Sequence, residues 1–170
     1  MREEIVNKVA KKELINLEMK SFKGSQKRAV IDISQWLFEG LILREKIFRT
    51  NLKTHNWEQY HDKYVAIYCE VDTIIPIWAY MLVVNYLKPY AKKTILGDQF
   101  SLEREIFKIN INQIDTNQYI DKRILIKGCS DTFIPDESFV LISEKLMDFA
   151  KAIMFGEACS NVPIFKKRKT

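Results

Sequence analysis

Short strand-like runs alternate with helical patterns through most of this chain, and this alternation constrains the fold more than any other feature. The strand-like runs are apolar, alternating or β-branched segments bounded by polar residues. They lie at residues 14–19, 29–34, 63–69, 92–97 and 122–129. Strands that alternate with helices are typical of α/β proteins. The sequence therefore predicts an α/β fold with a mainly parallel central sheet flanked by helices.

The helices expected around these strands are marked by apolar stripes and capping residues. They run through Lys12, over 41–55, from Asp72 and Thr73 to Leu87, from Ser101 onward, and from Pro135 to a stop at Gly156. Asp72 and Thr73 are natural N-cap residues, and Asp131 precedes the last helix in the same way. A final strand at 162–167 is expected to run antiparallel at the edge of the sheet.

The composition suits one domain with an apolar core. The chain has 170 residues, 47% of them hydrophobic, so it can bury a core without metal or disulfide crosslinks. No linker-like stretch divides residues 1–165, which are therefore predicted to form a single α/β domain. Residues 166–170 form a basic C-terminal tail.

The charge balance argues against binding to nucleic acid. The net charge is +5, from 27 basic and 22 acidic residues, and four of the basic residues lie in the tail. The remaining 23 basic residues nearly balance the 22 acidic ones, so the body lacks the broad basic field of nucleic-acid-binding proteins. The most apolar window, 74–87, is shorter than the roughly 20 residues that cross a membrane. We predict neither nucleic acid nor membrane as a partner, and a protein partner stays open.

Two strand-to-helix junctions have nearly the same letters. Residues 68–76 read YCEVDTIIP and residues 127–135 read KGCSDTFIP. Cys159 lies in a third similar stretch, GEACSNVP, before the final strand. The carboxyl ends of parallel strands share one edge of a sheet, where ligand sites of such folds form. If the final strand is antiparallel, all three cysteines reach that edge.

Three thiols at one edge would suit zinc or iron, because soft thiolates favour these metals. The candidate ligands are Cys129, Cys159, Cys69, Asp131 and Asp72, with His55, His61 or water as further choices for a fourth position. The leading hypothesis is a metal- or sulfur-handling accessory protein. The cysteines are 60 and 30 residues apart, however, unlike the close pairs of familiar metal motifs.

Two other interpretations use the same cysteines. A cysteine just before a helix N-terminus faces the positive end of the helix dipole, which would favour the thiolate of a thiol-dependent enzyme or redox protein. Alternatively, the cysteines are buried side chains of a structural or interaction module that binds no metal. Nucleotide-binding glycine motifs and the H-E-x-x-H and G-x-S-x-G motifs are absent, so the sequence assigns no catalytic and no cofactor-binding residue.

Cysteine usage also bears on location. The three cysteines are an odd number, and the charged start of the chain lacks the apolar region of a secretory signal. Both features argue for a reducing compartment, and we predict a cytoplasmic protein.

Four stretches resemble a known family. They are WLFEGLILREKIFR, YVAIYCEVDTIIPIWAYML, ILIKGCSDTFIP and MFGEACSNVPIFK. They are similar to recurring stretches of the bacterial proteins grouped as domain of unknown function 2480, and the likeness covers nearly the whole chain. The resemblance implies a neighbourhood of iron–sulfur cluster assembly genes, which favours metal or sulfur handling. It implies no activity, because function has to be argued from a site.

Overall fold

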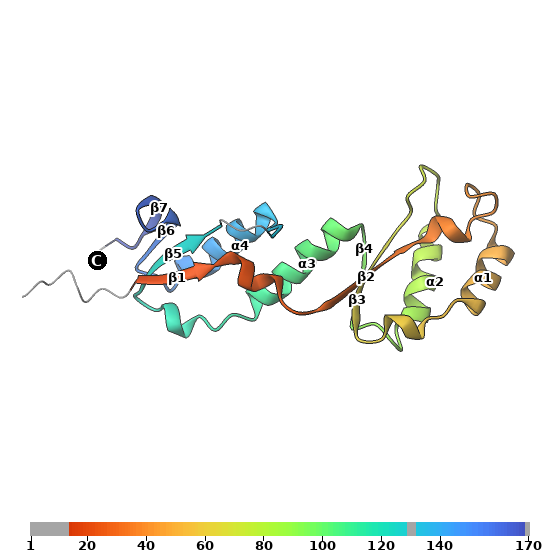
Figure 1. The fold of residues 1–170 in the computed structure, drawn as a ribbon, viewed down its shortest axis with the longest axis horizontal. Helices are drawn as coiled ribbons and strands as arrows, with labels where there is room; N and C mark the ends of the chain where they lie inside the picture. Colours follow the sequence, from red (N-terminus) through yellow and green to blue (C-terminus); the bar gives the residue numbers. More distant parts are fainter. Residues whose placement is uncertain (1–13, 129–131, 169–170) are drawn as a thin grey trace, which may run out of the picture. The chain divides into compact units, whose positions relative to one another are not determined.

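A computed structural model describes residues 14–128 and 132–168, which cluster into two compact units (Figure 1). The four-stranded unit comprises the described residues up to 24 and those from 107 onward, and the three-stranded unit comprises residues 25–106. The strands thus divide between two sheets, where the sequence predicted one central sheet. The single domain expected over residues 1–165 stays a prediction, because a domain is defined by cooperative folding.

The four-stranded sheet has the order β1-β5-β6-β7. Its strands are β1 (Leu14–Glu18), β5 (Arg123–Lys127), β6 (Ala152–Glu157) and β7 (Ser160–Lys166). The first three are parallel, and β7 is antiparallel to β6. Helix α4 (Asp136–Met147) connects β5 to β6, and a short 3-10 helix (Met19–Lys23) follows β1. The predicted antiparallel edge strand is therefore confirmed.

The three-stranded sheet has the order β2-β3-β4, and all its strands are parallel. Its strands are β2 (Lys27–Asp32), β3 (Lys63–Tyr68) and β4 (Lys93–Leu96). Its helices are α1 (Glu45–Thr54), α2 (Ile77–Leu87) and two short 3-10 helices, Ile33–Trp36 and Glu58–Tyr60. Helix α1 lies between β2 and β3 in the chain, and α2 lies between β3 and β4. The mixed α/β class predicted from the sequence is confirmed.

Helix α3 (Gln99–Asn112) contributes to the cores of both units. Leu102 and Ile106 pack with Ala66 of β3 in the three-stranded unit. Phe107, the next residue, and Ile111 belong to the core of the four-stranded unit. A short 3-10 helix (Asn117–Tyr119) then leads into β5.

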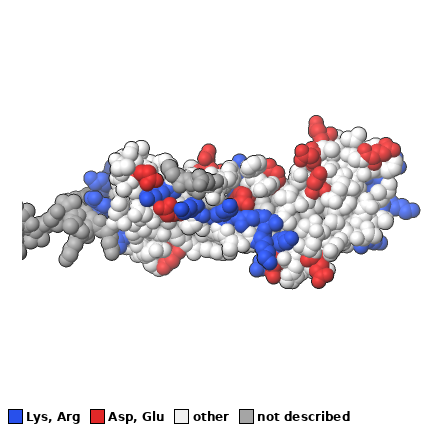
Figure 2. Space-filling view, in the orientation of Figure 1, with Lys and Arg blue, Asp and Glu red and all other residues white. Residues whose placement is uncertain are grey.

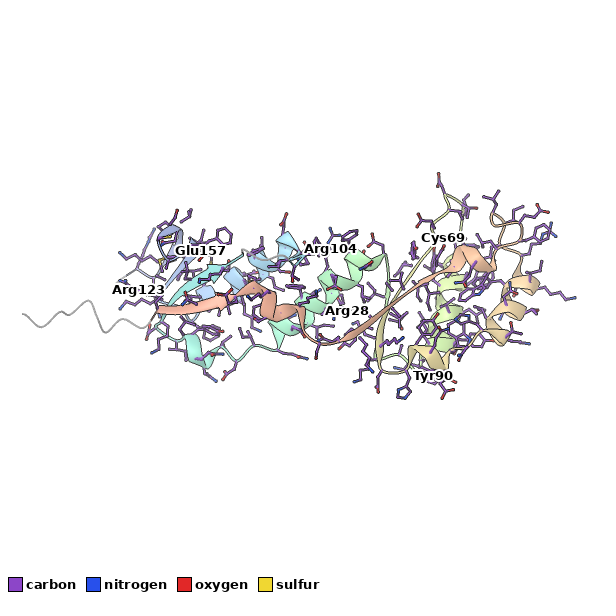
Figure 3. The ribbon with its side chains drawn as sticks, viewed as in Figure 1. Arg28, Cys69, Tyr90, Arg104, Arg123 and Glu157 are labelled. Carbon is purple, nitrogen blue, oxygen red and sulfur yellow. The ribbon has the colours of Figure 1, made fainter. Side chains whose placement is uncertain are left out.

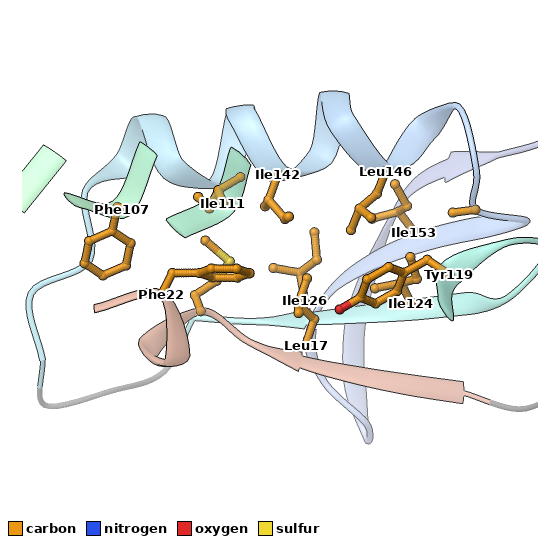
Figure 4. Packing of buried hydrophobic residues seen from close by; sticks show 12 residues of the cluster. Leu17, Phe22, Phe107, Ile111, Tyr119, Ile124, Ile126, Ile142, Leu146 and Ile153 are labelled. Carbon is orange, nitrogen blue, oxygen red and sulfur yellow. The ribbon is translucent and has the colours of Figure 1, made fainter. Parts of the chain in front are cut away.

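The core of the four-stranded unit lies between its sheet and the two helices α3 and α4 (Figure 4). Ile142 and Leu146 of α4 face Ile124 and Ile126 of β5, and all four side chains are buried. Full burial of one such side chain stabilises the fold by about 1.5–3 kcal/mol. This packing holds the Ile142 and Leu146 side of α4 on the sheet, and Val140 on the other side of the helix is exposed to solvent.

The two units repeat one pattern of strand, helix, strand, helix, strand. Tyr64 pairs with Lys93 in one sheet, and Arg123 pairs with Ala152, each 59 positions later, in the other. The buried positions of α1 and α2 recur at this spacing in α3 and α4: Phe48, Leu52, Val83 and Leu87 correspond to Phe107, Ile111, Ile142 and Leu146. The repeat β2-α1-β3-α2-β4 lies in the chain between β1 and the other elements of its own repeat, α3-β5-α4-β6. Consecutive strands β1 and β2 therefore join different sheets.

The end of the last helix was predicted wrongly. Helix α4 ends at Met147, and residues 152–157, expected to be helical up to Gly156, form strand β6. Ile153 has helical spacing from Leu146, but the Leu146 carbonyl accepts the N–H groups of both Phe149 and Ala150 and closes the helix in a turn. The helical spacing of Leu146 and Ile153 is therefore a coincidence, because a turn separates the two residues.

The start of α2 also differs from the prediction. The helix begins at Ile77 with Pro76 as its N-cap residue, so neither Asp72 nor Thr73 caps it. A residue before proline is held in an extended conformation, which keeps Ile75 and the residues before it out of the helix. The helix expected through Lys12 lies outside the described residues.

Candidate functional site

The carboxyl edge of the three-stranded sheet is organised around Asp32. Its carboxylate accepts hydrogen bonds from the Ser34 N–H at 2.9 Å, from the Ser34 hydroxyl, and from the Glu70 N–H at 3.1 Å. Burial raises the pKa of Asp32, but the hydrogen bonds from Ser34 and Glu70 outweigh it and the pKa is lowered. The carboxylate thus ties the end of β2 to the residues after β3 and has a structural role.

Cys69 lies at this edge, at the opposite end of the sheet from Tyr90 (Figure 3). Its thiol donates to the Val71 carbonyl at 3.5 Å. Burial raises the pKa of Cys69, and the negative charges of Asp32 and Glu70 raise it further. The expectation of a thiolate favoured by the helix dipole is wrong for Cys69, because α2 begins only at Ile77.

Asp72 lies on the surface of the loop between β3 and α2. Its side chain is exposed, and the neighbouring Thr73 hydroxyl donates to the Leu41 carbonyl at 2.8 Å, which anchors the loop. Asp72 is therefore neither a helix cap nor part of a ligand group within the described structure.

Cys159 lies at the carboxyl edge of the other sheet, in the turn between β6 and β7, and it is exposed. The neighbouring strand end carries Lys127, whose Nζ lies 3.6 Å from Glu18 and 3.5 Å from Glu157. The antiparallel β7 thus brings Cys159 to the edge that the sequence predicted. Cys129 and Asp131, the other predicted ligands of this edge, lie outside the described residues.

The three cysteines follow strands of two different sheets, where the sequence expected one common edge. Cys69 follows β3, and Cys159 follows β6. In the repeat, Asp131 stands 59 positions after Asp72, and Cys69 corresponds to Gly128, not to Cys129. Among residues 14–128 and 132–168, no group of three or more His, Cys, Asp or Glu side chains could hold a metal ion.

The two histidines are used in other ways. The Nε2 atom of His55 lies 3.0 Å from the Tyr60 hydroxyl, and burial lowers the pKa of His55. His61 is exposed, with its Nδ1 atom 3.2 Å from Asp62, and comes just before β3. Both histidines precede the amino end of β3, away from the strand end that leads to Cys69.

An apolar groove on the four-stranded unit is the surface that sequence reasoning missed. It has a volume of about 430 Å³ and lies between one flank of α4 and the strands β6 and β7. Its lining residues are Ile126, Phe139, Val140, Ser143, Glu144, Met147, Phe155 and Ile164. Val140 is 70% exposed, Ile164 47% and Phe155 40%. The side chains that line the groove are mostly apolar and reachable from solvent.

The floor of the groove depends on a glycine. The rings of Phe139 and Phe155 meet edge to face, with centroids 5.6 Å apart. A Cβ atom at Gly128 would stand 2.9 Å from Phe139 and 3.2 Å from Phe155, so any side chain at this position would have to displace the two rings. The signals for this groove in the sequence were Val140 on the polar side of its helix and the apolar final strand.

The groove has few groups that could perform chemistry. Among its described lining residues, Glu144 carries the one charge and Ser143 the one hydroxyl. Large exposed apolar surfaces of this kind mark places where proteins bind partners. Figure 2 shows acidic and basic side chains on the visible face, and a band of adjoining Lys and Arg side chains among them. Within the described residues, no helix is long and apolar enough to cross a membrane.

The comparisons with known proteins give a family. Neither the curated proteins nor the solved structures include a match to the chain. The family described as "Protein of unknown function (DUF2480)" matches residues 3–167, nearly the whole length. The resemblance noted in the sequence is thereby confirmed, and the chain belongs to the DUF2480 family.

Proposed function

We propose that this protein is an interaction module that binds an amphipathic helix of a partner protein in the groove beside α4. The observation that supports the proposal is the groove of about 430 Å³, lined mostly by apolar side chains of α4, β6 and β7. Binding would remove Val140, Phe155 and Ile164 from water, which supplies a hydrophobic driving force.

A helix fits this groove because it occupies the next position in a layer of helices. Ile142 and Leu146 hold α4 over β5, and β6 and β7 extend the same sheet beyond it. Neighbouring helices pack with their axes about 8–10 Å apart, so a partner helix beside α4 would rest on Phe155 and Ile164. Recognition would follow the helix-in-groove mode, with apolar anchors spaced three or four residues apart.

The charge of the groove predicts one more property of the partner. Glu144 lines the groove and is exposed, and an apolar stripe with a Lys or Arg beside it would complement this carboxylate. Such a rim contact adds selectivity and faster association more than affinity. The expected partner segment is therefore a basic amphipathic helix.

The test is a selection of helical peptides from a display library against the full chain, followed by titration of the enriched peptides. Peptides with an apolar stripe and a flanking Lys or Arg are the expected outcome. Val140→Glu, which buries a charge in the complex, is expected to weaken their binding by about tenfold or more. Glu144→Lys should weaken the binding of basic peptides and leave the binding of uncharged peptides unchanged.

Met81→Glu is the matched control. Met81 has the position in α2 that Val140 has in α4, 59 residues later, and the two are similarly exposed, at 66% and 70%. This variant is expected to bind the peptides as the unchanged protein does. Failure to enrich any helical peptide, or binding that Val140→Glu leaves unchanged, contradicts the proposal. Binding of small apolar molecules alone would also contradict it.

A metal or thiol site at Cys129 and Cys159 is the second candidate function, in a cytoplasmic protein of the kind the sequence predicts. Its support is the antiparallel turn that holds Cys159 at the carboxyl edge of the sheet in which β5, the strand before Cys129, ends. Elemental analysis of protein prepared without chelator tests it. A stoichiometric metal that is lost in Cys159→Ser would support this candidate, and the absence of metal in air and without oxygen would reject it.

A further inference from the structure

We propose that two copies of this chain associate by antiparallel pairing of their β4 strands. The interface would lie on the three-stranded unit and is separate from the groove beside α4. Each three-stranded sheet would then continue into that of the second copy across a two-fold axis. In a two-fold interface the same patch serves both copies, so this contact closes without forming a fibre.

Strand β4 is an outer strand of the three-stranded sheet, without a further strand beside it among the described residues. It is the last strand in the order β2-β3-β4, whereas the corresponding strand β6 is covered by the antiparallel β7. The outer strand β7 contains Pro163, and its pairing has an irregular register, two features that discourage further pairing. The segment Lys93–Leu96 has neither proline nor bulge. The repeat thus shows that this position of the fold accepts an antiparallel strand.

An apolar face accompanies this edge. Leu96 of β4 is 60% exposed, and three side chains of α2 lie at spacings of four and three. These are Ile77, Met81 and Val84, exposed by 64%, 66% and 41%. Met81 and Val84 of α2 and Leu96 of β4 correspond to groove residues of the other repeat, and this correspondence places them where α2 borders β4; Met81 also borders a hollow shared with Glu45 and Arg49 of α1. Two-fold pairing would bring both sets together and remove them from water.

Charge complementarity favours a second copy as the occupant. Lys92 and Lys93 lie at the start of β4, and Asp98 follows its end. Glu70 lies at the same carboxyl edge, after the neighbouring strand β3. In an antiparallel pair, the start of each strand meets the end of the other, so the lysines of one copy approach the acids of the second.

The ion pairs that Lys92 and Lys93 form within one copy leave both lysines accessible to acidic groups of a second copy. Lys93 Nζ lies 3.0 Å from Glu105, and Lys92 Nζ lies 3.5 Å from Asp62, yet both lysines keep exposed fractions of 43% and 59%. Exposed pairs of this kind are weak and can be shared with another carboxylate. We therefore expect the association to weaken severalfold when the salt concentration is raised.

Sedimentation velocity of the full chain over a wide range of concentration tests the proposal. A mass that doubles with concentration is the expected result. Met81→Glu and Leu96→Lys are each expected to raise the dissociation constant by about tenfold or more, because each places a charge in the apolar contact. Both side chains are exposed, so circular dichroism should show an unchanged fold.

Val140→Glu, at the corresponding position of the other repeat, is the matched control and should leave the dimer intact. A chain that stays monomeric at every concentration overturns the proposal. So does a dimer that neither Met81→Glu nor Leu96→Lys weakens, or one that Val140→Glu dissociates. Val140→Glu is expected to weaken peptide binding and leave the dimer intact, whereas Met81→Glu is expected to weaken the dimer and leave peptide binding intact. The two proposals can therefore fail independently of each other.

Discussion

Arg28 on β2 holds Glu103 on α3 through two charge-assisted hydrogen bonds within the three-stranded unit. Its Nε atom donates to Oε1 at 2.7 Å, and its Nη2 atom donates to Oε2 at 3.1 Å. The two side chains are only 22% and 13% exposed. Arg28 also donates to the Gln26 carbonyl. A bidentate pair with so little exposure fixes the first turns of α3 on the sheet.

Glu103→Gln should therefore destabilise the protein. The variant keeps the shape of the side chain but leaves a poorly compensated guanidinium in a partly buried place. We expect the free energy of unfolding in urea to fall by about 1–3 kcal/mol. Glu45→Gln, in the pair with Arg49 (2.8 Å, with Glu45 62% and Arg49 49% exposed), should change the free energy of unfolding by less than about 0.5 kcal/mol. Equal effects of the two variants would contradict the role of Arg28.

The environment of His55 predicts a loss of stability in acid. Its ring packs against Trp36 and Trp57, with centroids 5.1 and 4.7 Å away. Burial lowers the pKa of His55 below its ordinary value of 6.5. The unfolded chain therefore binds this proton more readily than the folded protein does. The contribution of His55 to stability is complete above pH 6.5 and is lost as the pH falls below it, towards the lowered pKa.

Removal of the titrating ring should flatten this dependence. Urea midpoints of His55→Gln are expected to fall less between about pH 7 and pH 5 than those of the unchanged protein. His61→Gln is the control, because the side chain of His61 is 66% exposed. A pH dependence that His55→Gln leaves as steep as before would show that His55 is not its source.

The two described cysteines should differ in reactivity. Burial raises the pKa of the Cys69 thiol, whereas Cys159 is exposed in a turn. In a Cys129→Ser background at neutral pH, a disulfide reagent is expected to modify Cys159 first and Cys69 several times more slowly. Cys159→Ser should abolish the fast phase. A fast phase that persists in Cys159→Ser would mean that Cys69 is the reactive thiol.

The predicted single domain can be tested through the tryptophans. All three, Trp36, Trp57 and Trp78, lie in the three-stranded unit, so their fluorescence reports on that unit. Leu146→Ala removes a buried side chain from the four-stranded unit and should cost about 2–5 kcal/mol. Because α3 contributes to both cores, we expect this variant to shift the fluorescence transition.

Leu87→Ala, at the corresponding position of the three-stranded unit, gives the reference shift. Equal shifts of the fluorescence transition for the two variants are the expected outcome for one cooperative domain. A transition that Leu146→Ala leaves in place would mean that the two units unfold separately.

Periodicity predicted most of the secondary structure because strand and helix patterns are local. The strands predicted at 14–19, 29–34 and 63–69 appear as β1, β2 and β3. The errors lie where tertiary contacts or turns overrule spacing. Helix α3 begins at Gln99 because the carboxylate of Asp98 accepts the Ser101 N–H at 2.8 Å, so Asp98 takes the role that Ser101 was expected to have.

The division into two sheets was not legible from local pattern, because it depends on which strand pairs with which. The signal was nevertheless present as a repeat longer than the two cysteine junctions. Around the starts of β3 and β5, Gln59, Tyr60, Asp62 and Lys63 recur as Gln118, Tyr119, Asp121 and Lys122. Asp62 and Asp121 both have positive φ, of 59° and 55°. The cysteines do not occupy corresponding positions in the two repeats, because Cys69 corresponds to Gly128. The predicted site therefore combined residues that follow strands of two sheets.

The groove was missed for a related reason. An exposed valine on a helix and an apolar final strand are each ordinary, and only the fold places Val140 beside Phe155 and Ile164. Sequence patterns find faces of single elements, whereas a groove needs the crossing of several elements.

The most direct test of the proposed function is a methyl-resolved NMR titration with an enriched helical peptide. Binding in the groove should shift the methyl signals of Ile126, Met147 and Ile164, which line it. Signals of Met81 and Leu96, on the corresponding face of the other repeat, should stay in place at the same peptide concentration. Shifts confined to Met81 and Leu96, or spread evenly over both units, would contradict the assignment of the groove beside α4 as the binding site.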